Sequence, residues 1–237
     1  MRKRMGALAT AALIALAGTA ACGTHDKQKG PASGTQTEIL SGSPLIPATD
    51  VVDTVSYADH VLVVTVTAER ELPADQEIKR GEGMIMREVT LNVDETLWSR
   101  PGAAQAAPRS IKSNAAGWVL RKNERTPFAT QGDSRLEVGN TYIMAVYRLQ
   151  ERGYAADDWM PFVTLPYNDK QIGHGEQTGG KPRPAGVLSK TEGQSAAALS
   201  ALLTATQPDP ISTKYLHLDG AARYRATAAE KHPVAPR

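Results

Sequence analysis

Two β-type segments in the first half of the chain constrain its fold more than any other feature. Residues 60–69, HVLVVTVTAE, are mostly apolar and β-branched, which is typical of a largely buried strand. Residues 89–98, VTLNVDETLW, alternate apolar and polar side chains, and this period of two indicates a strand with one solvated face. The intervening residues 71–83 are polar and contain proline and glycine, which predicts a loop. We therefore expect the two strands to pair as a hairpin.

Two segments with helical spacing flank the β-rich region. Residues 49–58, TDVVDTVSYA, place apolar side chains at helical spacing behind Thr49, a suitable N-cap. Residues 195–205, SAAALSALLTA, form a second predicted helix, and Ser189 and Glu192 ahead of it have the spacing of a capping box.

The other strand predictions complete the fold class. Residues 141–149, TYIMAVYRL, predict a strong strand, and residues 159–167 predict another, which Pro161 and Pro166 place at a sheet edge. Shorter strands are expected at residues 110–112, 117–121 and 185–188, and loops at residues 99–108, 123–138 and 168–184. This order predicts a mainly β fold, a small antiparallel barrel or sandwich with a short N-terminal helix and a C-terminal helix.

The segments ADHVLVVTVTAE, VTLNVDETLW and EVGNTYIMAVYRL, between residues 58 and 149, resemble a known type of module. Their order is similar to that in the OB-like barrels of netrin-like and metalloprotease-inhibitor-like domains of exported proteins. Members of that inhibitor family carry an N-terminal disulfide framework, whereas this chain has one cysteine. The resemblance therefore implies a barrel-like fold, and it transfers no inhibitory activity or residue.

The first 21 residues have the three-part layout of an export signal. A cationic start, residues 2–4, is followed by an apolar run over residues 5–17 and by small residues up to Ala21. A helix that crosses a bilayer needs about 20 apolar residues, and this alanine-rich run is shorter. The start lacks an Arg-Arg pair, which favours general secretion over the twin-arginine route. Residues 1–21 are therefore predicted to be a signal peptide.

The segment Thr19-Ala20-Ala21-Cys22 resembles the lipobox of bacterial lipoproteins. Thr19 stands where that family usually has leucine. The resemblance implies a diacylglyceryl group on Cys22 and cleavage between Ala21 and Cys22. Two acyl chains suffice for stable attachment to a membrane, whereas one chain does not. The alternative is an ordinary signal that ends near Cys22 and leaves an exposed thiol, which is a liability in an oxidising compartment.

Composition predicts the organisation of the remaining chain. Residues 22–43 are rich in small and polar residues and are expected to form a flexible tether. Residues 44–220 have the length of a single β-rich domain, and residues 221–237 are expected to form a disordered tail. Without its signal the chain changes in formal charge from +2 to −1, which gives no support for nucleic-acid binding.

No recognised catalytic or metal-binding motif accompanies this layout. The five histidines lack metalloprotease spacing, and His60, at the start of a strand, is expected to be a satisfied structural histidine at the boundary of the core rather than a metal ligand. The sole cysteine excludes an internal disulfide and thiolate zinc sites. The adjacent carboxylates Asp94 and Glu95 point to opposite faces of a strand, which argues against paired acid–base chemistry. We predict no catalytic, cofactor-binding or metal-binding residue.

Three functions remain open. The favoured hypothesis is a lipoprotein anchored through Cys22 on the extracytoplasmic side of the cell membrane. It would act as a binding or interaction module for an envelope protein or a small ligand. The alternative is an envelope hydrolase whose site combines Asp157, Asp158, His174 and Glu176, which requires their side chains to meet in one cleft. The third is an accessory or structural protein without a small ligand.

Overall fold

The computed structural model describes residues 37–42, 45–46, 48, 50–72, 81–149, 158–173 and 191–232. All of them belong to one compact unit, residues 35–237. Its elements are, in chain order, β1 (Glu38–Leu40), α1 (Val51–Tyr57), β2 (His60–Glu71), β3 (Glu82–Ser99), β4 (Ser110–Arg121), β5 (Glu124–Thr130), β6 (Thr141–Arg148), β7 (Trp159–Asn168), β8 (Gln171–Ile172), α2 (Ala196–Ala205), the 3₁₀ helix η2 (Ser212–Tyr215) and α3 (Gly220–Lys231).

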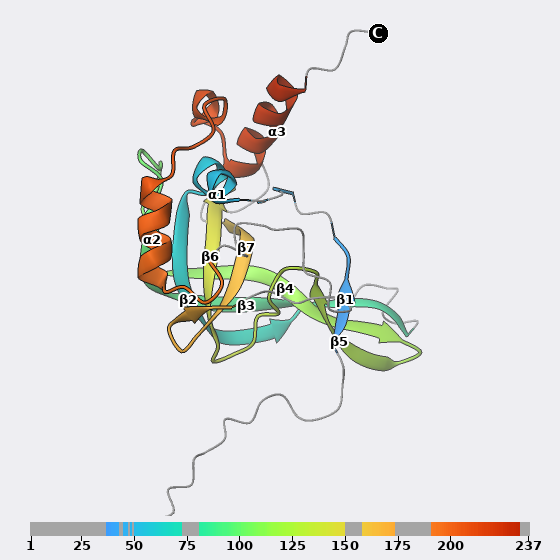
Figure 1. Ribbon diagram of the computed structural model, residues 1–237. Helices are drawn as coiled ribbons and strands as arrows, with labels where there is room; N and C mark the ends of the chain where they lie inside the picture. The colour runs from blue at the N-terminus through green and yellow to red at the C-terminus, as the bar shows by residue number, and fades with distance from the viewer. Residues whose placement is uncertain are drawn as a thin grey trace, which may run out of the picture. The chain divides into compact units, whose positions relative to one another are not determined.

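The strands form one strongly curled sheet. Its order is β1-β5-β4-β3-β2-β6-β7-β8, and all neighbouring pairs are antiparallel except β1 with β5. Strands β3, β4 and β5 cross below β6 and β7 (Figure 1), and β4 contacts β7 although three strands lie between them in the sheet. The sheet is therefore a half-barrel. This confirms the predicted mainly β class with a C-terminal helix, whereas α1 follows β1 and does not precede all of the strands.

The predicted hairpin of β2 and β3 is confirmed. Their register runs from His60 opposite Ser99 to Glu71 opposite Arg87, with three irregularities along the way. Such bulges increase the local twist of a strand pair and help a sheet to curl. Strand β3 begins at Glu82, earlier than predicted, because its first residues pair with β4.

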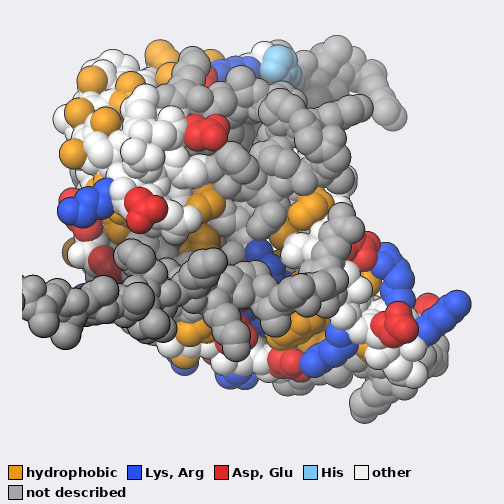
Figure 2. Space-filling model, turned by 60° about the horizontal axis from the view of Figure 1, so that its bottom comes forward, with side chains coloured by type: hydrophobic (Ala, Val, Ile, Leu, Met, Phe, Trp, Pro, Cys, Tyr) orange, Lys and Arg blue, Asp and Glu red, His pale blue; other side chains and the backbone are white. Residues whose placement is uncertain are grey.

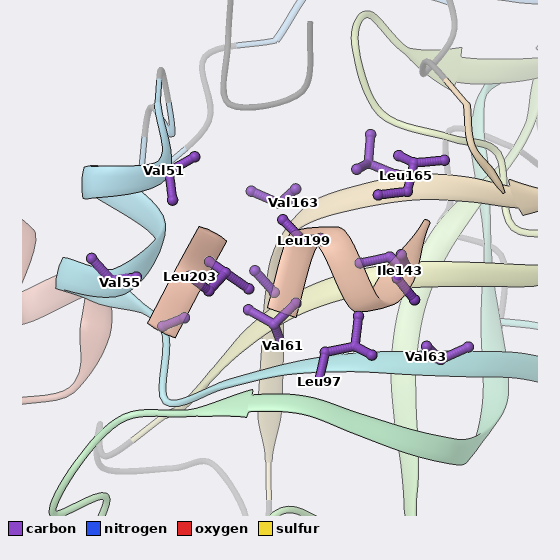
Figure 3. Packing of buried hydrophobic residues seen from close by; sticks show 14 residues of the cluster. Val51, Val55, Val61, Val63, Leu97, Ile143, Val163, Leu165, Leu199 and Leu203 are labelled. Carbon is purple, nitrogen blue, oxygen red and sulfur yellow. The ribbon is translucent and has the colours of Figure 1, made fainter. Parts of the chain in front are cut away.

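Strands β2 and β6 are neighbouring inner strands of the sheet, and the first part of β2 and most of β6 are buried on both faces. Val61, Val63 and Ile143 face the helices and pack against α1 and α2 (Figure 3), whereas Leu62 and Met144 point into the half-barrel. Two buried faces require apolar residues at successive positions. This explains why the segment 60–66 reads as a continuous apolar run rather than as an alternation.

The two predicted helices form, but different residues cap them. Helix α1 is capped by Asp50, whose side chain accepts a hydrogen bond from the backbone N–H of Asp53 at 2.9 Å; Thr49 lies outside the described residues. Helix α2 is capped by Ser195, which accepts from the N–H of Ala198 at 3.2 Å. The predicted capping box of Ser189 and Glu192 is therefore wrong, since the helix begins after Gly193 and Gln194.

Helix α2 also covers an edge of the sheet. Strand β4 pairs with β3 only up to Asn92, which leaves the last part of β3 without a strand on that side. The Ser200 hydroxyl donates to the Leu97 carbonyl at 2.6 Å, and Leu199 and Leu203 are buried against the strands. The helix thus satisfies a backbone acceptor at the edge and shields the apolar face beside it.

Two predicted boundaries of the domain are wrong. Residues 38–40, assigned to the tether 22–43, form β1 and pair in parallel with residues 128–130 of β5. Residues 221–231, assigned to a disordered tail, belong to α3, which Asp219 caps by accepting from the N–H of Ala222 at 2.8 Å. Both segments are ordered by contacts with distant parts of the chain, β1 with β5 and α3 with α1 and β6, which local composition does not reveal.

The region 110–138 also differs from the prediction. The two short strands expected at residues 110–112 and 117–121 form one strand, β4, and part of the expected loop forms β5. A two-residue turn joins them, in which Lys122 and Asn123 have φ angles of 50° and 67°. Positive φ at both central residues is the signature of a type I′ hairpin turn, which suits the twist of the strands. The predicted strand at residues 185–188 lies outside the described residues.

Candidate functional site

Four strand ends meet at one end of the half-barrel and enclose a small hollow. The register places the start of β2 beside the ends of β3 and β6, and Arg148 of β6 lies opposite Trp159 of β7. The hollow has a volume of about 80 Å³, well above the roughly 10–15 Å³ that one water requires. Its lining residues come from these strand ends, the loop after β3 and the segment after η2: Asp59, Arg100, Gly102, Ala104, Gln105, Arg148, Trp159, Leu216, His217 and Leu218.

The carboxylate of Asp59 organises this end of the molecule. Its Oδ1 accepts from Arg100 Nε at 3.0 Å and from Arg100 Nη2 at 2.8 Å, and its Oδ2 accepts from the backbone N–H of Arg148 at 3.0 Å. The Asp59 carbonyl also accepts from the Arg100 N–H at 2.8 Å. Both side chains are buried, and the carboxylate therefore clamps the ends of β3 and β6 to the start of β2.

A second guanidinium reaches the same carboxylate from α3. Arg223 is fully buried, and its Nη2 lies 3.6 Å from Asp59 Oδ1. Its Nη1 donates to the Ser56 carbonyl at 2.8 Å and its Nη2 to the Leu218 carbonyl at 3.0 Å, while Nε has no partner among the described residues. Burial, and secondly the neighbouring Arg100, lower the pKa of Arg223, which Asp59 counteracts. The pairing fastens α3 to α1 and to the sheet.

His60 lies beneath the hollow and is bonded at both ring nitrogens. Its Nε2 lies 3.1 Å from the Gln105 carbonyl, which can only accept, so Nε2 carries the hydrogen and Nδ1 accepts from the Ser99 hydroxyl at 2.9 Å. The ring also packs on Trp159, with centroids 5.1 Å apart. The prediction of a structural histidine is confirmed.

Because His60 is buried, we expect the protein to be less stable in mild acid than at neutral pH. Burial lowers the pKa of His60 below its ordinary value, although Asp59 partly opposes this. As the pH falls below about 6.5, the unfolded chain therefore takes up a proton at this position more readily than the folded protein does. We expect the free energy of unfolding, measured by urea titration at pH 7.5 and 5.5, to be lower at pH 5.5. A His60→Gln variant should depend less on pH, and an equal dependence would contradict this role.

A second charged cluster surrounds Trp118 on β4. The guanidinium carbons of Arg125, Arg135 and Arg87 lie 4.9, 5.6 and 5.7 Å from the indole centroid, within the range of cation–π attraction. Each arginine is paired with a glutamate, in the pairs Arg125–Glu71, Arg135–Glu137 and Arg87–Glu69. The cluster is thus neutral as a whole.

Backbone carbonyls accept further hydrogen bonds from two arginines of this cluster, Arg87 and Arg135. Arg135 Nη1 donates to the carbonyls of Ala116, Gly117 and Phe128 at 2.6–2.9 Å, and Arg87 Nε donates to that of Ala116 at 2.8 Å. The arginines therefore join β3, β4, β5 and the loop before β6. Because these arginines bind glutamates and backbone carbonyls of the protein itself, we interpret the cluster as structural.

The structure does not test the alternative hydrolase site, because Asp157, His174 and Glu176 lie outside the described residues. Cys22, the proposed lipid attachment site, also lies outside them. Asp158 is described, and its carbonyl accepts from the N–H of Leu149 at 2.9 Å, beside the start of β7. Within the described ranges no group of three or more histidine, cysteine or acidic residues is arranged to hold a metal ion.

The charges on the described surface are mixed in sign. Figure 2 shows acidic and basic side chains interspersed on one face rather than gathered into a patch of one sign. Two exposed arginines pair with glutamates, Arg121 with Glu38 at 2.7 Å and Arg70 with Glu88 at 2.9 Å. Nucleic-acid binding uses a continuous basic face, and the described side chains in Figure 2 do not form one on the face shown.

Comparison with known proteins identified no relative of this chain. Neither the family models nor the curated proteins provide a match for this chain. Among the described residues, no helix has both the length and the apolar character needed to cross a membrane. Asp59, Arg100 and Arg223 escaped the sequence analysis because they are far apart in the chain; of the three, Asp59 and Arg100 line the hollow. The sequence offered one weak indication of this ion pair: a charged residue, Asp59, directly precedes β2, and another, Arg100, directly follows β3.

Proposed function

We propose that this protein is an exported lipoprotein, anchored through Cys22 on the extracytoplasmic side of the membrane, which acts as a binding module. The observation that carries the proposal is the sequence of the first 22 residues, a cationic start and a short apolar run that ends in Thr19-Ala20-Ala21-Cys22. A two-chain lipid on one sulfur would hold the half-barrel at the membrane without a spanning helix.

The bonding around the hollow supports binding rather than catalysis. A general base needs a lone pair that can reach the substrate proton. Both oxygens of Asp59 already accept hydrogen bonds, and both ring nitrogens of His60 are engaged with Ser99 and Gln105. Protonation of Asp59 would remove the charge that pairs with Arg100, and proton transfer by His60 would break its hydrogen bond with Ser99 or Gln105. The hollow is better suited to recognising a group that fits between its walls.

A Cys22→Ser variant tests the anchor. A serine hydroxyl cannot form the thioether that carries the diacylglyceryl group, so we expect complete loss of labelling by radioactive palmitate. The variant should also leave the membrane fraction or persist with its leader uncleaved. Metabolic labelling followed by fractionation of the cells measures both effects.

Thr24→Ser is the matched control, since it changes a residue two positions downstream and keeps the sulfur. It should be labelled and fractionate like the natural protein. Palmitate labelling of the Cys22→Ser variant at the natural level would refute lipid attachment at this residue.

A further inference from the structure

We infer that the hollow binds the acetamido group of an N-acetylated sugar, with the amide carbonyl inside the hollow and the sugar ring at its mouth. The inference rests on the proposed function and names the ligand of the binding module. It is drawn from the hydrogen-bond donors, the charge, the size and the rim of the hollow.

Two buried side chains give the hollow hydrogen-bond donors that lack a partner. Arg100 donates to Asp59 through Nε and Nη2, and its Nη1 has no partner among the described residues. Within the same ranges the indole N–H of Trp159 has none either. The unpartnered side-chain atoms that the protein encloses fully there are Arg223 Nε and Thr227 Oγ1, so the free donors of Arg100 and Trp159 retain access to solvent. Both residues line the hollow, although less than a tenth of each is exposed.

The inner walls offer these donors an acceptor-poor surrounding. Both carboxylate oxygens of Asp59 already accept, from Arg100 and from the N–H of Arg148, and the Gln105 carbonyl lies 3.1 Å from His60 Nε2. A carbonyl oxygen has two lone pairs and no hydrogen, so it can accept from both free donors. A hydroxyl or a primary amide would also bring a hydrogen that Asp59 has no free oxygen to accept, and an unsatisfied buried donor is costly. The group beside the carbonyl is therefore a methyl rather than an NH₂.

The charge of the hollow favours a neutral ligand. Arg100 is paired with Asp59. Behind the wall, Arg223 lies 3.6 Å from the same carboxylate and also interacts with Asp219, so two aspartates match two arginines. Arg148 has an interaction of its own and does not count as a free cation. An anion would enter without a counter-ion, whereas an amide carries no charge.

The size of the hollow favours a group that projects from a larger molecule. A volume of about 80 Å³ suits an acetamido group and is too small for a sugar ring to enter. The methyl at the end of that group can pack on the apolar lining, Trp159 and Leu218. An amide within a peptide chain is flanked by a Cα atom on both sides and has no such free end.

The rim favours a sugar outside the hollow. Gln105, Leu216 and His217 are lining residues and are exposed, Leu216 by 41%. The side-chain amide of Gln105 and the imidazole of His217 have no partner in the described part of the chain, and each can donate to or accept from ring hydroxyls. Leu216 provides apolar surface for the C–H face of the ring.

The test uses the lipidated protein purified in a sugar-free detergent, with ¹⁵N-labelled tryptophan. The chain has three tryptophans, and only Trp159 lines the hollow, so the indole resonances of Trp98 and Trp118 serve as internal controls. Methyl N-acetylglucosaminide is titrated, with methyl glucoside, sodium acetate and N-acetylalanine methylamide as comparison ligands at constant ionic strength. We expect the N-acetylated sugar to bind most tightly, with a saturable downfield shift of the Trp159 indole proton alone.

Trp159→Phe should weaken binding of the N-acetylated sugar about fivefold to tenfold, which corresponds to the loss of one hydrogen bond while an apolar ring is kept. Trp98→Phe is the matched control and should bind like the natural protein. Titration calorimetry measures both. If Trp159→Phe does not fold, the exposed rim variant Gln105→Leu takes its place. It should also weaken binding, since it removes a partner of the sugar hydroxyls and keeps the backbone carbonyl that bonds to His60.

Four results of the titration would overturn the proposal: no saturable shift of the Trp159 indole, equal shifts of all three indoles, methyl glucoside binding as tightly as the N-acetylated sugar, or tighter binding of acetate or the acetylated amino-acid amide. Unchanged affinity in the folded variant would do so as well. The titration does not depend on the state of Cys22. Its failure is therefore distinct from failure of the lipid anchor, which palmitate labelling measures separately.

Discussion

Replacing Asp59 by asparagine should lower the free energy of unfolding by about 3–5 kcal/mol, the range seen when one partner of a buried ion pair is removed. Asparagine has nearly the shape of aspartate, so the loss would come from charge. Arg100 and Arg223 would remain buried with their shared carboxylate gone. Urea unfolding followed by circular dichroism measures the difference.

Two further variants show whether the effect belongs to this pair. Glu95→Gln removes a carboxylate from an exposed position of β3 and should change stability by less than about 0.5 kcal/mol. The double variant Asp59→Asn/Arg223→Met should recover part of the loss, because methionine removes one of the uncompensated cations. A loss in Asp59→Asn no larger than that in Glu95→Gln would contradict the role of the clamp.

Replacing Gly117 by alanine should destabilise the protein by about 3 kcal/mol, at the upper end of the usual cost of overpacking. A Cβ atom at this position would lie 2.1 Å from the Ile85 carbonyl oxygen, and backbone cannot rotate away as a flexible side chain could. The clash falls where the pairing of β3 with β4 shifts register after Ile85. The strands would have to separate there.

The surroundings of Gly117 provide a specific readout. Its carbonyl accepts from Arg135, which stacks near Trp118, so a displaced strand should also change the near-ultraviolet circular dichroism of that indole. Gly42→Ala is the control, since its Cβ would approach only the Thr130 methyl group, at 3.3 Å. A Gly117→Ala variant as stable as Gly42→Ala would show that the strands adapt at no measurable cost.

The sequence predicted the central part of the fold well. The runs 60–69, 89–98 and 141–149 form β2, the later part of β3 and β6, and the leucines of 195–205 face the sheet in α2. These elements are governed by local pattern, since apolar residues at period two or 3.6 must face a core whatever surrounds them. The predicted signal peptide can also be recognised from the sequence, because such a signal is defined by the local order of charged, apolar and small residues rather than by a fold.

The sequence by itself therefore determined the class of the fold and the hairpin of β2 and β3. It is also the sole basis of the proposal that Cys22 carries a lipid. Only the tertiary structure decided that β1 and α3 are ordered, that β4 and β5 continue through polar residues, and that Asp59 holds Arg100 and Arg223 together. The physical reason is the distance along the chain between the partners. A polar segment or a lone charge has no local pattern that reveals its partner, and it becomes ordered only when folding brings that partner within hydrogen-bonding distance.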